Sequence, residues 1–221
     1  MRETIIVTGA YGSGKTEFCV NLALRFREES REKISIADLD VINPYFRSRE
    51  KIDYLQQFDI EILGNSLPGK RGIDLPAVSF GFLPHVQRGE RLIIDLAGGP
   101  AGLNLLAGLY ERLGAHDFLC VLNSYRPETN SKEKMLRFIR QTHDAGRLRV
   151  TGLVNNSHMI HETGPAHVLA GQEMILAVSK ELDIPLVYTQ LKRSVYEEIK
   201  DEIKSENLLI FEKLQMRETW Q

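Results

Sequence analysis

A glycine-rich motif at residues 9–16, GAYGSGKT, constrains the fold of this chain more than any other feature. It matches the pattern G-x-x-x-x-G-K-[ST] without a gap. An apolar run at residues 4–8 precedes it, and residues 17–24 follow with apolar side chains at helical spacing. This order of strand, tight loop and helix predicts a phosphate-binding loop, called the P-loop below, and so a site for a nucleoside triphosphate. The alternative is an ordinary glycine-rich turn.

The residue types in the P-loop suit the binding of a triphosphate. Glycines let several backbone N–H groups point toward one anion, at the positive end of the following helix. Lys15 is expected to reach the β- and γ-phosphates and to act in catalysis, and the Thr16 hydroxyl is expected to bind Mg²⁺. The predicted nucleotide-binding residues of this segment are Gly12, Ser13, Gly14, Lys15, Thr16 and Glu17.

Composition limits the class of protein further. The 221 residues are 43% hydrophobic and 26% charged, which predicts one compact domain over residues 1–221, with roughly 205–221 as a C-terminal appendage. A formal net charge of −2 makes nucleic-acid binding an unfavoured function. The apolar runs are too short for a membrane span and the first strand begins too early for a signal peptide, so a cytoplasmic location is expected.

Short apolar runs alternate with amphipathic segments along the chain. This alternation predicts an α/β fold, because each parallel strand connection needs a crossover helix. We expect three layers, a mostly parallel sheet with helices on both faces, with the P-loop at its carboxyl edge. The predicted strands are 4–8, 33–38, 56–63, 91–96, 117–122, 149–155 and 185–188. The predicted helices are 17 to about 30, a short one within 46–55, 101–113, 132–142, 165–182 and 192–204.

A second segment with recognisable chemistry starts with the apolar run 92–94 and continues through Asp95 to Gly98 and Gly99. At the end of a strand beside the P-loop, Asp95 would hold Mg²⁺ directly or through water. Gly98 or Gly99 could present a backbone N–H to the γ-phosphate. The alternative for this segment is a helix cap followed by a turn.

Asp38 and Asp40 are spaced by two residues at the end of the second predicted strand. A nearby cation would keep both carboxylates ionised, so that one could serve the metal and the other a water molecule. The alternative is a turn that uses Asp40 and Asn43 before Pro44. The loop is rich in aromatic residues and arginine, a composition typical of contact with a ligand or partner.

The order of these motifs resembles that of the CobQ/CobB/MinD/ParA family of MinD/ParA-like P-loop ATPases, over roughly residues 1–191. The resemblance implies a metal-dependent ATPase whose nucleotide is covered at a homodimer face. It also implies that Asp40 is the catalytic, water-orienting acid and that Asp38 lies nearer the metal. The predicted metal ligands are then Thr16, Asp38 and Asp95. Ala10 stands where this family has a signature lysine, and the P-loop also resembles that of nickel-insertion GTPases.

The end of a late strand reads Asn155, Asn156, Ser157, His158. GTPases recognise guanine with N-K-x-D, whose carboxylate accepts from two guanine N–H groups, and this segment has no acid in the fourth place. A neutral amide suits the mixed donor and acceptor edge of adenine. Asn155 or Asn156 is therefore predicted to select ATP over GTP, with a turn that closes the strand as the alternative.

Three further segments carry weaker predictions. The histidines at 158, 161 and 167 could approach a transition metal, but surface histidines are the favoured interpretation. The apolar tail at 207–214 resembles the membrane-seeking tails of some family members, whereas its acidic residues favour packing against the domain or a dimer partner. The insert at 64–89, rich in glycine and proline, is expected to form a partner or substrate surface.

These motifs leave three classes of function open. We favour a Mg²⁺-dependent ATPase, a nucleoside-triphosphate hydrolase that acts as a switch on an unidentified protein partner, because no substrate-binding pattern accompanies the nucleotide motifs. A homodimer is expected, with nucleotide-dependent assembly as one form of it. The alternatives are an ATP-dependent biosynthetic enzyme or kinase acting on a small molecule, and a metal-insertion or maturation NTPase.

Overall fold

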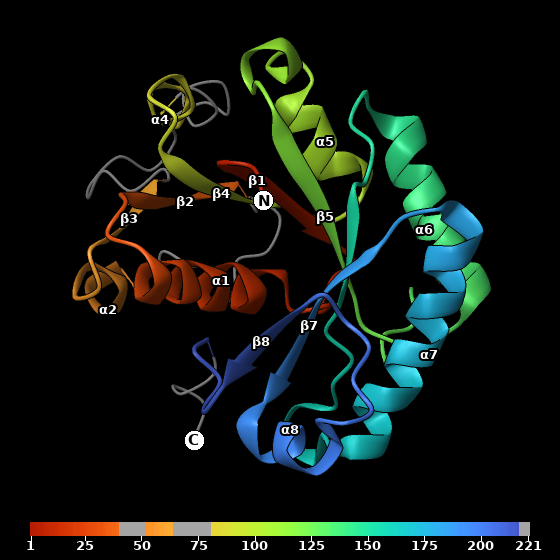
Figure 1. Ribbon diagram of the computed structural model, residues 1–221. Helices are drawn as coiled ribbons and strands as arrows, with labels where there is room; N and C mark the ends of the chain where they lie inside the picture. Colours follow the sequence, from red (N-terminus) through yellow and green to blue (C-terminus); the bar gives the residue numbers. More distant parts are fainter. Residues whose placement is uncertain (40–51, 64–80, 217–221) are drawn as a thin grey trace.

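Within the residues that the computed structural model describes, 1–39, 52–63 and 81–216, eight strands form one sheet. Their order is β3-β2-β4-β1-β5-β6-β7-β8, and all neighbouring pairs are parallel (Figure 1). The strands are β1 Thr4–Gly9, β2 Ile34–Leu39, β3 Ile60–Leu63, β4 Arg91–Leu96, β5 His116–Leu122, β6 Gly152–Asn155, β7 Leu186–Lys192 and β8 Asn207–Phe211. The predicted α/β fold is confirmed.

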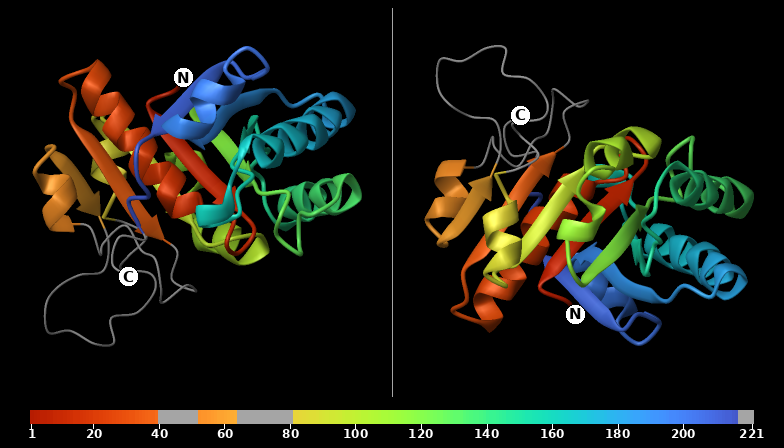
Figure 2. Two further views of the ribbon diagram at one scale, coloured as in Figure 1. Left: turned by 90° about the horizontal axis from the view of Figure 1, so that it is seen from below. Right: turned by 90° about the horizontal axis from the view of Figure 1, so that it is seen from above.

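Helices cover both faces of this sheet. Residues of α1 and α2 pack in one core, and residues of α4, α5, α6 and α7 pack in another. Figure 2 shows α6 and α7 side by side, as their contacts require. The helices are α1 Lys15–Glu29, α2 Ile52–Gln56, α4 Leu83–Gln87, α5 Pro100–Leu106, α6 Lys132–Ala145, α7 Pro165–Leu182 and α8 Arg193–Ile199.

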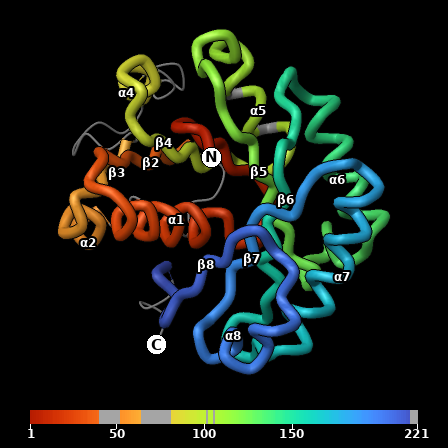
Figure 3. Tube along the Cα trace, in the orientation of Figure 1, coloured from red at the N-terminus to blue at the C-terminus, as the bar shows by residue number. Residues whose placement is uncertain are grey.

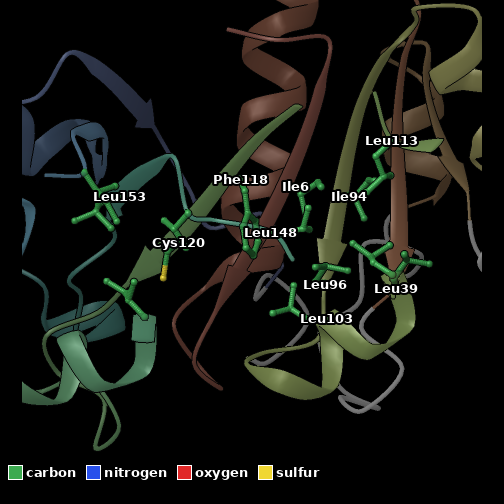
Figure 4. Packing of buried hydrophobic residues seen from close by; sticks show 14 of the residues in the cluster. Ile6, Leu39, Ile94, Leu96, Leu103, Leu113, Phe118, Cys120, Leu148 and Leu153 are labelled. Carbon is green, nitrogen blue, oxygen red and sulfur yellow. The ribbon is translucent and has the colours of Figure 1, made fainter. Parts of the chain in front are cut away.

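The side chains of β1 alternate between the two cores. Ile5 and Val7 pack with Phe18 of α1, whereas Ile6 packs with Phe118 in the opposite core (Figure 4). Each large apolar side chain that is fully buried contributes about 1.5–3 kcal/mol. A central strand with both faces covered is apolar on both sides over most of its length, which explains why the strands appear in the sequence as short continuous apolar runs.

Several boundaries differ from the sequence prediction. The helix predicted at 101–113 ends at Leu106, and a 3₁₀ turn, Tyr110–Arg112, follows it. Gly108 lies between the two, and glycine disfavours helix. Strand β7 continues beyond the predicted 188 to Lys192, and α8 starts within one residue of the predicted position but stops at Ile199 instead of 204. The insert at 64–89 contains α4, and its residues 64–80 lie outside the described part of the chain.

The apolar tail extends the sheet. Its first five residues form β8, which pairs with β7 and also contacts α1 (Figure 3). The predicted packing of this tail against the domain is confirmed for β8. No helix in the described ranges is long and apolar enough to cross a membrane. The carboxyl ends of β1, β4, β6, β7 and β8 lie at one edge of the sheet, because the strands are parallel.

Candidate functional site

The P-loop connects β1 to α1 at the carboxyl edge of the sheet. Gly14 precedes α1 with φ 85° and ψ 29°, a left-handed conformation. A Cβ atom at Gly14 would collide with the side-chain amide of Asn156. Glycine is thus required at this position both by backbone conformation and by close approach. The motif lies in the strand, loop and helix context that phosphate binding needs.

Lys15, Thr16 and the predicted metal carboxylates come together behind the P-loop. The Lys15 and Thr16 residues are 6% and 8% exposed. The Thr16 hydroxyl donates to Oδ2 of Asp95 at 2.7 Å. Asp38 stands opposite Asp95 in the β2–β4 register. The structure therefore places Thr16, Asp38 and Asp95 at one point of the sheet edge, whereas Asp40 lies outside the described residues.

The pKa of the Cys19 thiol reflects the charges that lie behind the P-loop. Burial raises the pKa of its thiol well above the ordinary value, and the charges of Asp95 and Asp38 raise it further. Lys15 acts in the opposite direction on the same pKa. The charges of Lys15, Asp95 and Asp38 thus all influence the pKa of the same fully buried thiol. This arrangement gives an oxygen-rich donor set, two carboxylates and a hydroxyl, of the kind that Mg²⁺ prefers.

Gly98 lies against the P-loop from the β4 side. A Cβ atom at this position would collide with the backbone carbonyl oxygen of Gly9. Gly99 follows with φ 65° and precedes Pro100, the first residue of α5. The segment predicted to face the γ-phosphate therefore does touch the P-loop backbone.

Gly98→Ala is expected to destabilise the fold because the new methyl group meets backbone that cannot move without shifting the P-loop. Overpacking of this kind costs about 1–3 kcal/mol in the free energy of unfolding, which chemical denaturation measures. Gly108→Ala is the matched control, since a Cβ atom there meets no heavy atom of the described residues within 4 Å. Equal unfolding free energies for the two variants would show that Gly98 is not tightly packed.

Asn156 links the P-loop to β7. Its side chain is buried, and its Nδ2 donates to the Ser13 carbonyl oxygen at 2.7 Å. Its Oδ1 accepts from Nε2 of Gln190 at 3.2 Å. Because a carbonyl oxygen only accepts, the bond to Ser13 fixes the orientation of both amides. Asn156 therefore holds the P-loop backbone at Ser13. Its bond to Nε2 of Gln190 also determines which polar atoms of the Gln190 amide remain available to a ligand.

Asn155 has a different environment from its neighbour. It is fully buried, its Nδ2 donates to the Val168 carbonyl oxygen, and its Oδ1 accepts from the backbone N–H of Ser157. Both polar atoms of the amide thus hold α7 and the loop after β6. Of the two asparagines predicted to select the base, only Asn156 lines the cavity beside the P-loop.

Glu17 was predicted to contact nucleotide, and the structure gives its carboxylate other partners. Oε1 accepts from the backbone N–H of Gln215 at 2.8 Å and from Nδ2 of Asn21 at 3.0 Å. Oε2 accepts from the backbone N–H of Met216 at 2.9 Å. Glu17 therefore ties the first turn of α1 to the segment that follows β8.

A cavity of about 400 Å³ opens beside the P-loop. Its walls come from the P-loop, the loop after β6, the end of β7 and residues 211–216, which we call the C-terminal segment. Ile160 in the loop after β6 has φ 58°, an unusual conformation for a β-branched residue. The apolar lining residues are Ile160, Val168, Leu191, Phe211, Leu214 and Met216. The sequence analysis identified none of these residues as part of a site.

Arg126 is a further site residue that the sequence analysis missed. It lies in the loop after β5, lines the cavity, and donates from Nε to the Gly12 carbonyl oxygen at 2.8 Å. No sequence motif marks this residue; its position follows from the strand order of the structure, in which β5 neighbours β1 and its following loop lies beside the P-loop.

The histidines around the loop after β6 take part in its local structure. His158 Nδ1 accepts from the Ile160 N–H, and His167 Nδ1 accepts from the Gly164 N–H at the start of α7. The His167 ring also packs edge-on against Tyr125. Within the described ranges, no group of three or more His, Cys, Asp or Glu side chains is placed to hold a metal ion.

Comparison with known proteins identifies the fold. No model of a known protein family matches this chain, and no curated protein matches it significantly. Among solved structures, the cell division protein FtsY from Thermotoga maritima has a TM-score of 0.58 and 22% identity, covering 86% of this chain and 62% of its own. The chain has the fold of a P-loop NTPase.

Two other similar structures extend this finding. FtsY from Elizabethkingia anophelis, in complex with GDP, has a TM-score of 0.58 and 20% identity, and the match covers 86% of this chain and 57% of that one. The 54 kDa signal recognition particle protein from Aeropyrum pernix, also with GDP, has a TM-score of 0.59 and 15% identity, over 96% and 42%. The chain thus spans less than two thirds of the length of these proteins. Membership of the MinD/ParA-like family remains a prediction.

Proposed function

We propose that this P-loop NTPase binds Mg·ATP, hydrolyses it and works as a nucleotide-driven switch on a protein partner. The observation that carries the proposal is the hydrogen bond between Thr16 and Asp95 beside the buried Lys15, at the P-loop end of β1. A hydroxyl, a carboxylate and a lysine in this relation serve the metal and the phosphates of a nucleotide.

Thr16, Asp38 and Asp95 would hold the Mg²⁺. Their oxygens are the ligands that this cation prefers, and all three residues are buried at the same end of neighbouring elements. When bound, Mg²⁺ neutralises charge on the β- and γ-phosphates. Lys15 would pair with the same phosphates, and the backbone of Gly98 or Gly99 would contact the γ-phosphate.

The cavity beside the P-loop favours adenine as the base. Glu17 is the one carboxylate among the described lining residues, and backbone N–H groups engage both of its oxygens. No lining carboxylate is thereby placed to accept from the two N–H groups of guanine. Asn156 and Gln190 supply neutral amides instead, which suit the mixed edge of adenine. GTP is the alternative, because similar structures were solved with GDP.

ATP is expected to bind at least about tenfold more tightly than GTP. The two neighbouring N–H donors of guanine would find no carboxylate to accept from them, which weakens the binding of GTP by about 1.4 kcal/mol or more. Competition of each nucleotide against a fluorescent ATP analogue, with Mg²⁺ present, measures the ratio. Inorganic tripolyphosphate serves as a control for binding by the P-loop alone. Displacement by GTP at the same concentration as ATP would contradict the adenine assignment.

A switch and a small-molecule enzyme differ in what raises turnover. The Gly98 backbone lies against the P-loop, so loss of the γ-phosphate would change the contacts of both segments together. This coupling favours a switch whose slow basal hydrolysis changes when a protein partner binds, with a homodimer as one such assembly. Phosphate release that requires an added small molecule would favour the kinase or biosynthetic alternative instead.

A further inference from the structure

The bond between Glu17 and the C-terminal segment joins parts of the chain that are 199 residues apart in sequence. Glu17 immediately follows Thr16, so its backbone belongs to the first turn of α1. The residue lines the cavity beside the P-loop, and its side chain accepts from the Gln215 and Met216 N–H groups. An acid so close to a phosphate site therefore serves a task other than direct phosphate binding, which like charge would oppose.

The energetics make this contact a firm anchor. Glu17 is 8% exposed, and its carboxylate accepts three N–H donors. Hydrogen bonds to a charged group contribute about 1.5–3 kcal/mol each. Two of the donors are backbone N–H groups of the C-terminal segment, so the anchor fixes the path of its backbone, and the third is the Asn21 side chain of α1 itself. Met216 is 4% exposed and packs in the core that contains Phe18 of α1.

The anchored segment forms part of the cavity wall. Phe211, Leu214 and Met216 line the same cavity as Gly14 and Lys15 of the P-loop. Further apolar lining comes from Ile160 and Leu191, on the loop after β6 and on β7. An apolar slot that opens directly beside a phosphate site has the character that a flat, hydrophobic base requires. The strained backbone of Ile160 is a further sign of a functional constraint in this wall.

We infer that Glu17 is a positioning residue, which holds the C-terminal segment as a wall of the nucleobase slot. This inference rests on the proposed nucleotide site and deepens it. The segment then contributes to binding of the nucleoside part of ATP and leaves binding of the triphosphate part unchanged. Because coupling is reciprocal, an occupied slot must in turn stabilise the C-terminal segment.

Glu17→Gln tests the inference with little change of shape. The amide has one acceptor oxygen and places an NH₂ group against a backbone N–H, so the segment loses part of its anchor. We expect the variant to bind Mg·ATP about 10- to 100-fold more weakly, the equivalent of one lost charged hydrogen bond. Its affinity for Mg·tripolyphosphate is expected to stay within about twofold of the wild type. Glu28→Gln, an exposed site on the same helix, is the matched control.

The outcomes separate the inference from the proposed function. Equal losses for ATP and tripolyphosphate would show that Glu17 acts through the P-loop, and an unchanged ATP affinity would show that the anchor does not shape the slot. Either result overturns the inference. Wild-type protein that binds neither ligand would overturn the proposed function itself, before any substitution is compared.

A measurement on the wild type keeps the test valid if Glu17→Gln does not fold. Hydrogen exchange in a peptide that covers residues 211–216 is expected to slow when Mg·ATP binds and to stay unchanged with Mg·tripolyphosphate. This difference arises because only ATP fills the slot. Exchange that is the same with ATP as without it would overturn the inference.

Discussion

Lys15→Ala is expected to abolish measurable binding of Mg·ATP. Lys15 is the buried cation of the P-loop and is expected to pair with both the β- and γ-phosphates. Charged hydrogen bonds are worth about 1.5–3 kcal/mol each, so the loss of two lowers affinity by about 10²–10⁴-fold. Isothermal titration with Mg·ATP measures this loss directly.

Lys180→Ala provides the control for Lys15→Ala. Lys180 is an exposed residue near the end of α7, outside the cavity lining. The substitution Lys180→Ala removes the same charge without changing the P-loop, so its affinity for ATP should equal that of the wild type. If folded Lys15→Ala bound ATP as tightly as the wild type, the P-loop assignment would be wrong.

Asp40→Ala and Asp95→Ala are expected to separate hydrolysis from binding. If Asp40 orients the attacking water, its loss lowers kcat by about 10²–10⁴-fold and leaves the affinity for Mg·ATP unchanged. Asp95 bonds to Thr16 and is expected to serve the metal, so its loss should weaken Mg²⁺-dependent binding as well. Titration and a phosphate-release assay on each variant distinguish the two effects.

Asp144→Ala, at an exposed position of α6, is the control for the loss of one carboxylate. Hydrolysis by Asp40→Ala at the wild-type rate would leave Asp40 with the role of a turn residue. Loss of nucleotide affinity in Asp40→Ala would place it in the metal site instead, and Asp38 would become the candidate for orienting water. Asp95→Ala with unchanged Mg²⁺ dependence would contradict the proposed metal ligands.

The central part of the fold was predictable because local and global signals agree there. The P-loop requires a strand before it and a helix after it, and β1 and α1 lie where the motif puts them. The buried strands β4 and β5 also contain continuous apolar runs, at 92–94 and 118–122. A strand that is covered on both faces can be recognised from its own apolar residues, without knowledge of the neighbouring strands.

The C-terminal strand could not be assigned from its own residues. The run Asn207–Phe211 is short and apolar, and periodicity alone does not distinguish a strand from a buried helix turn at that length. Its conformation is decided by the free edge of β7, with which it pairs. Similarly, the strand predicted at 185–188 continues as β7 to Lys192, because a strand end depends on where its partner ends.

The candidate site was only partly predictable for a related reason. Motif spacing identifies Lys15, Thr16 and Asp95 because each lies in a short segment at or directly after the end of its own strand. Glu17 has its partners in the C-terminal segment, and Arg126 has its partner in the P-loop, so neither contact leaves a local pattern. Asn155 and Asn156 are adjacent and identical, and only their tertiary partners, α7 for Asn155 and the P-loop for Asn156, distinguish them.

The pairing of Glu17 with Met216 also bears on the order in which a newly made chain acquires its properties. A growing polypeptide contains the whole P-loop once Thr16 has been added, but the wall at Phe211, Leu214 and Met216 arrives almost two hundred residues later. Closing so long a loop carries an entropy cost that local contacts do not. If the nucleotide site is as proposed, a ribosome-bound chain that has not yet reached β8 therefore contains the phosphate-binding backbone before the slot for the base is complete. Selectivity among nucleotides would then be acquired late in synthesis, after the capacity to bind phosphate.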